Sequence, residues 1–230
     1  MDIILIPGLW LDASSWDAVL PALERAGHRP HPLTMPGVGA PAAESSAVGI
    51  ADWVDAAVSA IDAADGDVIV VGHSGGGNVA WGAADARVDR VARVVFVDTF
   101  PPSDGGSIWE FPVVDGVVPF PGWATFEQPE IDDLDAATRE RVAARAKTVP
   151  ERVPTDAIRL HDPRRLALPV TMLSGTMTRA QLQEIIDAAP AWAADLAGLA
   201  DLTVVELRSG HWPQFSQPDA FARALVAALE

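Results

Sequence analysis

A serine lies among glycines directly after a short apolar run, where it could act as a nucleophile. The run at 67–71 leads into Gly72-His73-Ser74-Gly75-Gly76, a G-x-S-x-G pattern, and a stretch that could form a helix follows. A serine hydroxyl is a poor nucleophile at neutral pH and needs an adjacent base. A tight strand-to-helix turn can present Ser74 to that base. The pattern therefore predicts a nucleophile elbow, although an ordinary flexible turn at 75–77 would have the same composition.

One of the five histidines has the best position to be that base. His211 lies in Ser209-Gly210-His211-Trp212-Pro213, just after the last expected strand. Loops at the carboxyl edge of an open α/β sheet converge on one site, so His211 and Ser74 are expected to meet there. The side chain of His73 should diverge from that of Ser74. The other histidines are expected to be surface or hydrogen-bonded polar residues, of which His161 could still touch substrate: His28, His31 and His161.

Strand-like and helix-like segments alternate along the chain. This predicts an α/β fold over one domain, 1–230, with a mainly parallel sheet and helices on both faces. Strands are expected at 3–6, 28–33, 67–71, 91–97, 169–173 and 202–207. Helices are expected at 13–26, 50–63, 78–86 and 218–229.

The alternation breaks at residues 100–166, which are rich in proline and aromatic residues and contain one clear helical stretch near 135–148. We interpret this segment as a cap inserted between two core strands and call it the cap segment. Its aromatic residues, which include Phe111, are more numerous than a surface loop needs, so several are expected to face a pocket. Packing of the segment on the core would explain them equally well. The candidate pocket residues are Trp10, Trp109, Phe120, Trp123 and Phe126.

Composition narrows the possible partners. The chain has 230 residues, of which 49% are hydrophobic, and a net charge of -16, which argues against nucleic acid and anionic membranes as partners. The absence of cysteine excludes disulfides and thiolate chemistry. No ligand cluster or phosphate-binding loop indicates a metal or an organic cofactor. The start MDIILIPG lacks the basic lead of a signal peptide, so a cytoplasmic protein is expected. The expected partner is a small-molecule substrate. The oligomeric state stays open.

Five motifs occur in order along almost the whole chain. They are Pro7-Gly8-Leu9-Trp10 with Trp16, Pro36-Gly37-Val38-Gly39, the Ser74 elbow, Val97-Asp98-Thr99-Phe100-Pro101, and Gly210-His211-Trp212-Pro213. Together they resemble the α/β-hydrolase family, specifically the compact esterases similar to plant methylesterases and hydroxynitrile lyases. The order nucleophile, acid, histidine is also that of the family.

The resemblance implies which groups would hold a developing oxyanion. In relatives, the N–H group after the glycine of the first loop and the N–H group after the nucleophile do so. Carried over, these donors belong to Leu9 and Gly75. Pro7 stands where relatives usually have histidine, which leaves the backbone donors in place.

The acid that would orient His211 departs from the family pattern. Relatives usually carry it in the turn that corresponds to 173–178, which has no carboxylate here, and Glu184 should lie too far along the next helix. Asp98 ends the strand beside that of Ser74 and is our candidate, although it could be only a structural hinge where the cap segment begins. Glu206 is a weaker third candidate.

These residues predict a serine hydrolase that cleaves a carboxylic ester or lactone of a small to medium, mainly apolar substrate through an acyl-enzyme. A lyase similar to hydroxynitrile lyases is one alternative, but those enzymes typically depend on a basic residue in the cap, and Lys147 is the only lysine. A ligand-binding member of the fold with weakened catalysis is the other, because the 173–178 turn lacks an acid.

Overall fold

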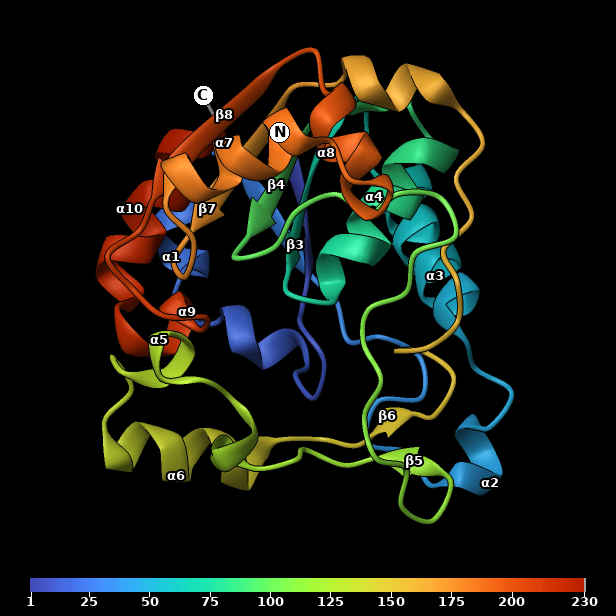
Figure 1. Ribbon diagram of the computed structural model, residues 1–230, viewed down its shortest axis with the longest axis vertical. Coiled ribbons are helices and arrows are strands. Elements are labelled where there is room, and N and C mark those ends of the chain that lie inside the picture. The colour runs from blue at the N-terminus through green and yellow to red at the C-terminus, as the bar shows by residue number, and fades with distance from the viewer. Residues whose placement is uncertain (230) are drawn as a thin grey trace.

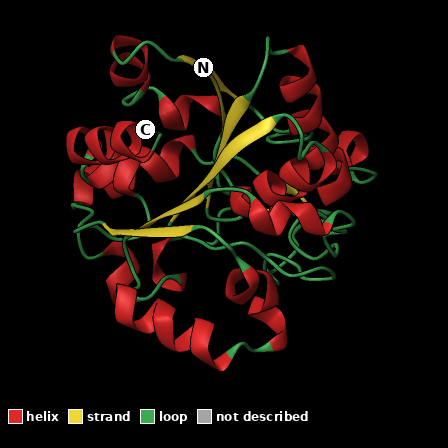
Figure 2. Cartoon of the chain, turned by 90° about the horizontal axis from the view of Figure 1, so that it is seen from above, coloured by secondary structure: helices red, strands yellow, loops and turns green. Residues whose placement is uncertain are grey.

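Six parallel strands form the central sheet of the protein, whose computed structural model describes residues 1–229. The strand order is β2-β1-β3-β4-β7-β8, so β2 forms the edge on one side of β1 and the later strands are added one after another on its other side. The strands are β1 (Asp2–Ile6), β2 (Arg29–Pro32), β3 (Val68–His73), β4 (Val91–Val97), β7 (Val170–Ser174) and β8 (Leu202–Glu206). Figure 2 shows them in the middle of the molecule with helices on both sides. The predicted α/β fold class is confirmed.

Two layers of helices cover the sheet because successive strand side chains point to opposite faces. The longer helices outside the cap segment are α1 (Leu20–Arg25), α3 (Ile50–Ala63), α4 (Gly76–Ala86), α7 (Arg179–Ala188) and α10 (Pro218–Ala228). Ile3 and Leu5 of β1 pack in one apolar cluster with α1 and α10, whereas Ile4 and Ile6 pack in the other with α3, α4 and α7. The short ones are α2 (Ala42–Ser45), α8 (Ala194–Gly198), α9 (Pro213–Ser216), and the 3-10 turns η1 (Ala13–Trp16) and η4 (Ala191–Ala193). No helix within residues 1–229 is long and apolar enough to cross a membrane.

The helix predicted at 13–26 is wrong in one respect, because it is broken in two. A 3-10 turn, η1, ends at Trp16, and α1 begins only at Leu20, with Pro21 in its first turn. Proline has no N–H to donate and its ring clashes with the carbonyl four residues earlier, so a continuous helix through Pro21 is disfavoured. The helix predicted at 50–63 and the strand predicted at 91–97 have those same bounds.

The segment between β4 and β7 lies at the end of the sheet where the strands finish. It contains β5 (Val117–Val118), η2 (Trp123–Thr125), α5 (Gln128–Ile131), α6 (Ala136–Arg145), β6 (Val149–Pro150) and η3 (Pro163–Ala167). Figure 1 shows α5, α6 and the β5–β6 pair together on one side of the molecule. The Trp10 ring, just beyond β1, packs edge-on against Phe111 and Phe120 of this segment, with ring centroids 4.8 and 5.7 Å apart. The predicted helix near 135–148 is present as α6, which ends three residues earlier, at Arg145.

A buried arginine ties the end of the cap segment to the helices of one layer. Arg165 of η3 lies between two carboxylates, with its Nη1 3.1 Å from Asp85 of α4 and its Nε 2.8 Å from Asp195 of α8. Asp85 also accepts the N–H groups of His161 and Asp162, and Asp195 accepts the indole N–H of Trp81. Each buried charge therefore has several partners, which is the condition for burying it.

Replacing Arg165 with methionine should lower the free energy of unfolding by about 3 kcal/mol or more, because two buried carboxylates would lose their cation. Urea unfolding of the purified proteins measures the change. Arg164→Met is the matched control, since the neighbouring Arg164 pairs with Asp89 and Asp162 at the surface and its loss should change stability little. Equal stabilities of the two variants would contradict the role of Arg165.

Candidate active site

Ser74 occupies a tight turn between β3 and α4. Its φ of 51° is in the left-handed region, which non-glycine residues rarely adopt and which costs roughly 1–3 kcal/mol. Strand and helix come close together here, because a Cβ atom on Gly72 would lie only 2.5 Å from the carbonyl oxygen of Gly76. The glycines are therefore required by close approach, and the turn has the geometry expected of a nucleophile elbow.

A continuous chain of hydrogen bonds joins Ser74, His211 and Asp98. The Ser74 Oγ lies 2.8 Å from the His211 Nε2, and the His211 Nδ1 lies 2.6 Å from the Asp98 Oδ2. The three residues follow β3, β8 and β4, whose carboxyl ends share one edge of the sheet. The structure thus brings together the three side chains that the sequence analysis selected.

The turn after β7, where relatives usually carry the acid, donates hydrogen bonds to Asp98. Its Oδ1 accepts the backbone N–H groups of Gly175 and Thr176, each at 2.8 Å, and the Thr176 hydroxyl at 3.0 Å. Asp98 has a φ of 45°, so the chain turns sharply at the end of β4. The turn after β7 therefore supplies donors to a carboxylate that comes from β4.

These contacts keep Asp98 ionised and define the tautomer of His211. Burial alone would raise the pKa of Asp98, but its hydrogen bond to His211, the electrostatic attraction to that ring and the N–H groups of Thr176 and Gly175 outweigh burial and hold the pKa below its usual value. An ionised carboxylate can only accept, so the His211 Nδ1 carries the proton and donates it to Asp98. The His211 Nε2 is then free to accept the Ser74 hydroxyl proton.

His73 supports the loop that carries His211. Its Nε2 donates to the backbone carbonyl of His211 at 2.8 Å, and its Nδ1 lies 3.3 Å from the side-chain nitrogen of Gln214. Burial, and secondly the neighbouring His211 ring, lowers the pKa of His73 to about 3. His73 is therefore neutral near pH 7, and it is a hydrogen-bonding residue, as expected.

The two backbone donors inferred from the family resemblance lie beside Ser74. Leu9 and Gly75 both line the cavity around Ser74, and a Cβ atom on Gly75 would lie 3.1 Å from the Leu9 Cγ. Neither N–H group donates a hydrogen bond to another residue of the 1–229 region. Two adjacent unpaired N–H groups of this kind could hold an oxyanion.

The cap segment also contacts the His211 loop directly. The N–H group of His211 donates to the Glu130 carbonyl of α5, and that of Gly210 donates to the Asp133 carboxylate, both at 2.8 Å. The position of the catalytic histidine candidate therefore depends on the cap segment as well as on the sheet.

A cavity of about 1,020 Å³ opens above Ser74, His211 and Asp98. This is at the upper end of the roughly 300–1,000 Å³ of small-molecule sites. Of the five candidate pocket residues, Trp10, Trp109 and Phe126 line it. Phe120 and Trp123 do not, because they pack behind it: the Trp123 indole N–H donates to the Arg139 carbonyl, and its ring lies 5.1 Å from that of Phe120.

Several lining residues were missed by the sequence analysis. Trp192, from the segment after α7, lines the cavity and packs against Phe100, with ring centroids 5.6 Å apart. Asn78 lines it from the first turn of α4. Asn78 follows the elbow at helical spacing and could have been found, whereas nothing in the sequence brings Trp192 to this edge of the sheet.

The remaining candidates lie elsewhere. Glu206 accepts the N–H group of Arg179 at 2.7 Å, and His161 packs beside Asp85, so neither lines the cavity. His31 pairs with Asp2 at the far end of the sheet. Among residues 1–229, no group of three or more His, Cys, Asp or Glu side chains could hold a metal ion.

Comparisons with known proteins identify the family and the fold of this chain. Residues 3–224 match the model of the alpha/beta hydrolase family. Lipase LipV of Mycobacterium tuberculosis is 31% identical over 212 residues, which cover 78% of this chain and 77% of that protein. A carbendazim-hydrolysing esterase of a Nocardioides species is 35% identical over 107 residues, which cover 46% of this chain and only 44%, less than half, of that relative. The crystal structure of a methylesterase from Arabidopsis covers 100% of this chain and 98% of its own, with a TM-score of 0.72 and 19% identity, and shows the fold alone.

The neutral state of His73 should make stability depend on pH. The pKa of histidine is about 6.5 in an unfolded chain, whereas it is about 3 for folded His73. The unfolded state therefore binds more protons between these values, so His73 should reduce the unfolding free energy as pH falls, by up to about 1.4 kcal/mol per pH unit. Urea unfolding between pH 6.5 and 4.5 should show a steeper loss for wild type than for His73→Gln. Parallel slopes for the two proteins would contradict this.

Proposed function

Because this chain belongs to the alpha/beta hydrolase family, we propose that it is a serine hydrolase that cleaves a carboxylic ester or lactone through an acyl-enzyme. The family match bears out the resemblance of the motifs, and relatives named as an esterase and a lipase accompany it. The single observation that carries the proposal is the hydrogen-bonded chain from Ser74 through His211 to the buried Asp98.

In the proposed first step, the His211 Nε2 takes the proton of the Ser74 hydroxyl while the Ser74 Oγ attacks the ester carbonyl carbon. Asp98 keeps the His211 Nδ1 protonated and stabilises the imidazolium that forms. The N–H groups of Leu9 and Gly75 donate to the oxygen that becomes negative.

In the proposed second step, the tetrahedral intermediate collapses and the alkoxide leaves with the proton from His211. The acid portion stays on Ser74 as an ester. Water, deprotonated by His211, then attacks this acyl-enzyme and releases the carboxylic acid together with free Ser74. The net reaction consumes one water and needs no other co-reactant.

The proposed substrate is small to medium in size and mainly apolar. The cavity walls near Ser74 include Trp10, Ile108, Phe126 and Trp212, whose surfaces favour apolar groups. The 1,020 Å³ of the cavity leaves room for an aromatic or branched substituent on either side of the ester.

The lyase alternative has no support in the contacts. Lys147, the only lysine, does not line the cavity, and its backbone N–H donates to the Trp10 carbonyl. The binding-only alternative rests on the missing acid in the turn after β7. The hydrogen bonds that join Asp98 to that turn and to His211 argue against it.

Ser74→Ala and His211→Ala should each abolish hydrolysis of 4-nitrophenyl butyrate, with kcat falling by about 10⁶-fold by analogy with serine protease variants. A fluorophosphonate probe should label wild type at Ser74 and leave the Ser74→Ala protein unlabelled.

Unchanged hydrolysis or labelling in both variants would remove the assignment. Release of cyanide from mandelonitrile without ester turnover would favour the lyase. A wild type inert toward esters, thioesters and lactones would favour a binding protein.

A further inference from the structure

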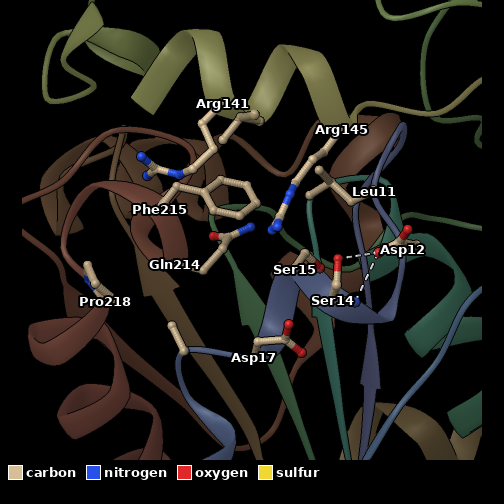
Figure 3. A pocket seen from close by; sticks show the side chains of 12 residues that line it. Leu11, Asp12, Ser14, Ser15, Asp17, Arg141, Arg145, Gln214, Phe215 and Pro218 are labelled. Atoms are coloured by element: carbon tan, nitrogen blue, oxygen red, sulfur yellow. Dashed lines mark hydrogen bonds between the residues drawn. The ribbon is translucent and has the colours of Figure 1, made fainter. Parts of the chain in front are cut away.

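A second pocket, of about 230 Å³, lies beside the catalytic cavity and shares no lining residue with it. Leu11 lines the second pocket and Trp212 the catalytic cavity, and both belong to one buried apolar cluster, so apolar side chains lie between the two spaces. The second pocket is formed by η1, α6 and the α9 region (Figure 3). Its volume far exceeds the roughly 30 Å³ that a water molecule occupies.

Gln214 gives this pocket an acceptor without a partner. Neutral His73 donates from Nε2 to the carbonyl of His211, so its Nδ1 can only accept, and it accepts from the Gln214 side-chain NH₂. This contact defines the orientation of the Gln214 amide. The Gln214 Oε1 is buried and makes no hydrogen bond within residues 1–229, although buried carbonyl oxygens are normally paired.

Ser15 adds a second polar group of the same kind. Its residue is 6% exposed, its Oγ is buried, and this hydroxyl also has no hydrogen-bond partner in the described chain. Two shielded polar atoms without partners in one pocket wall leave hydrogen bonds for a ligand to make.

Two arginines bring positive charge to the opposite wall. Arg141 and Arg145 are one turn apart on α6. In Figure 3 the Arg145 side chain is directed from that helix toward Gln214 and Ser15, whereas the Arg141 guanidinium lies on the other side of Phe215, away from Ser14 and Ser15. Neither forms an ion pair within the described residues, although the chain carries a net charge of -16. The Arg141 Nη2 makes one hydrogen bond, to the Thr138 hydroxyl, at 3.1 Å.

The two acidic residues of the pocket form no ion pair with these arginines among residues 1–229. The Asp12 Oδ1 already accepts the backbone N–H and the hydroxyl of Ser14, at 3.0 and 2.6 Å. In Figure 3, Asp17 lies at the end of the pocket away from α6. The remaining walls are apolar and come from Leu11, Val142, Phe215 and Pro218.

We propose that this pocket binds a small organic carboxylate with a branched aliphatic body and a hydroxyl group. The planar guanidinium group of Arg145 suits a carboxylate, the charge of Arg141 on the same wall adds to the attraction, and the apolar walls exclude a bare inorganic anion as the best fit. The ligand hydroxyl donates to the Gln214 Oε1 and lies beside Ser15. The site does not depend on the proposed ester hydrolysis, because none of its residues contacts Ser74.

Isothermal titration calorimetry with 2-hydroxy-4-methylpentanoate tests the site directly. The wild-type chain should bind it more tightly than 2-hydroxy-4-methylpentanamide, its neutral analogue of the same shape, by about fivefold or more. It should also bind it more tightly than 4-methylpentanoate, which lacks the hydroxyl donor. Absence of binding, or equal affinity for the acid and the amide, would overturn the proposal.

Two variants locate the binding. Arg141→Gln combined with Arg145→Gln should weaken affinity about fivefold or more, while Arg223→Gln, an exposed arginine on α10, serves as the control and should leave affinity unchanged. Ala18→Phe, at an exposed position of the pocket wall, should block binding by filling the space. Wild-type affinity in both pocket variants would place the ligand elsewhere, such as in the catalytic cavity, and would overturn the proposal.

Discussion

The buried carboxylate of Asp98 is the interaction on which the arrangement of the site depends. It joins three segments that are far apart in the sequence: the end of β4, the turn after β7 and the loop after β8. Its two oxygens receive the N–H groups of Gly175 and Thr176 and the ring N–H of His211. Because these donors outweigh the effect of burial on its pKa, Asp98 remains negative without a neighbouring lysine or arginine. One charge thus orients the histidine and holds two adjacent strand ends in register.

Backbone strain is concentrated around the same site. Five non-glycine residues in the described chain have positive φ angles, and three of them lie just beyond strands of the sheet. Ser74 and Asp98 directly follow β3 and β4, and Trp10 lies in the loop after β1. Such conformations persist only where the surroundings impose them. Here the surroundings are a fully parallel sheet with apolar layers on both faces, in which Val70, Val95 and Phe96 are completely buried. The stability of the sheet therefore supports the unfavourable turns that expose Ser74 and direct Asp98 toward His211.

Much of this architecture could be predicted because it depends on side-chain types. Runs of β-branched residues identify β3 and β4, helical spacing identifies α3, and glycines around Ser74 identify the elbow. The break between η1 and α1 follows from Pro21, whereas the spacing of apolar residues alone predicts one continuous helix.

Other features depend on backbone groups or on distant contacts. The donors that hold Asp98 are N–H groups, which every residue except proline has, so the letters at 175 and 176 do not reveal them. The directions of Phe120 and Trp123, and the approach of Trp192 to the cavity, follow from packing between segments that the sequence does not place.

The central claim is that Asp98 orients His211 although it comes from β4. Comparing Asp98→Asn with Glu206→Gln in ester hydrolysis tests this most directly, because Glu206 is the other candidate acid and contacts Arg179 instead of His211. The account predicts that Asp98→Asn lowers kcat by about 10⁴-fold, as neutralising the orienting acid does in a serine protease, while the protein still unfolds cooperatively and Glu206→Gln retains nearly full activity. An Asp98→Asn protein within tenfold of wild type, or a loss confined to Glu206→Gln, would contradict it.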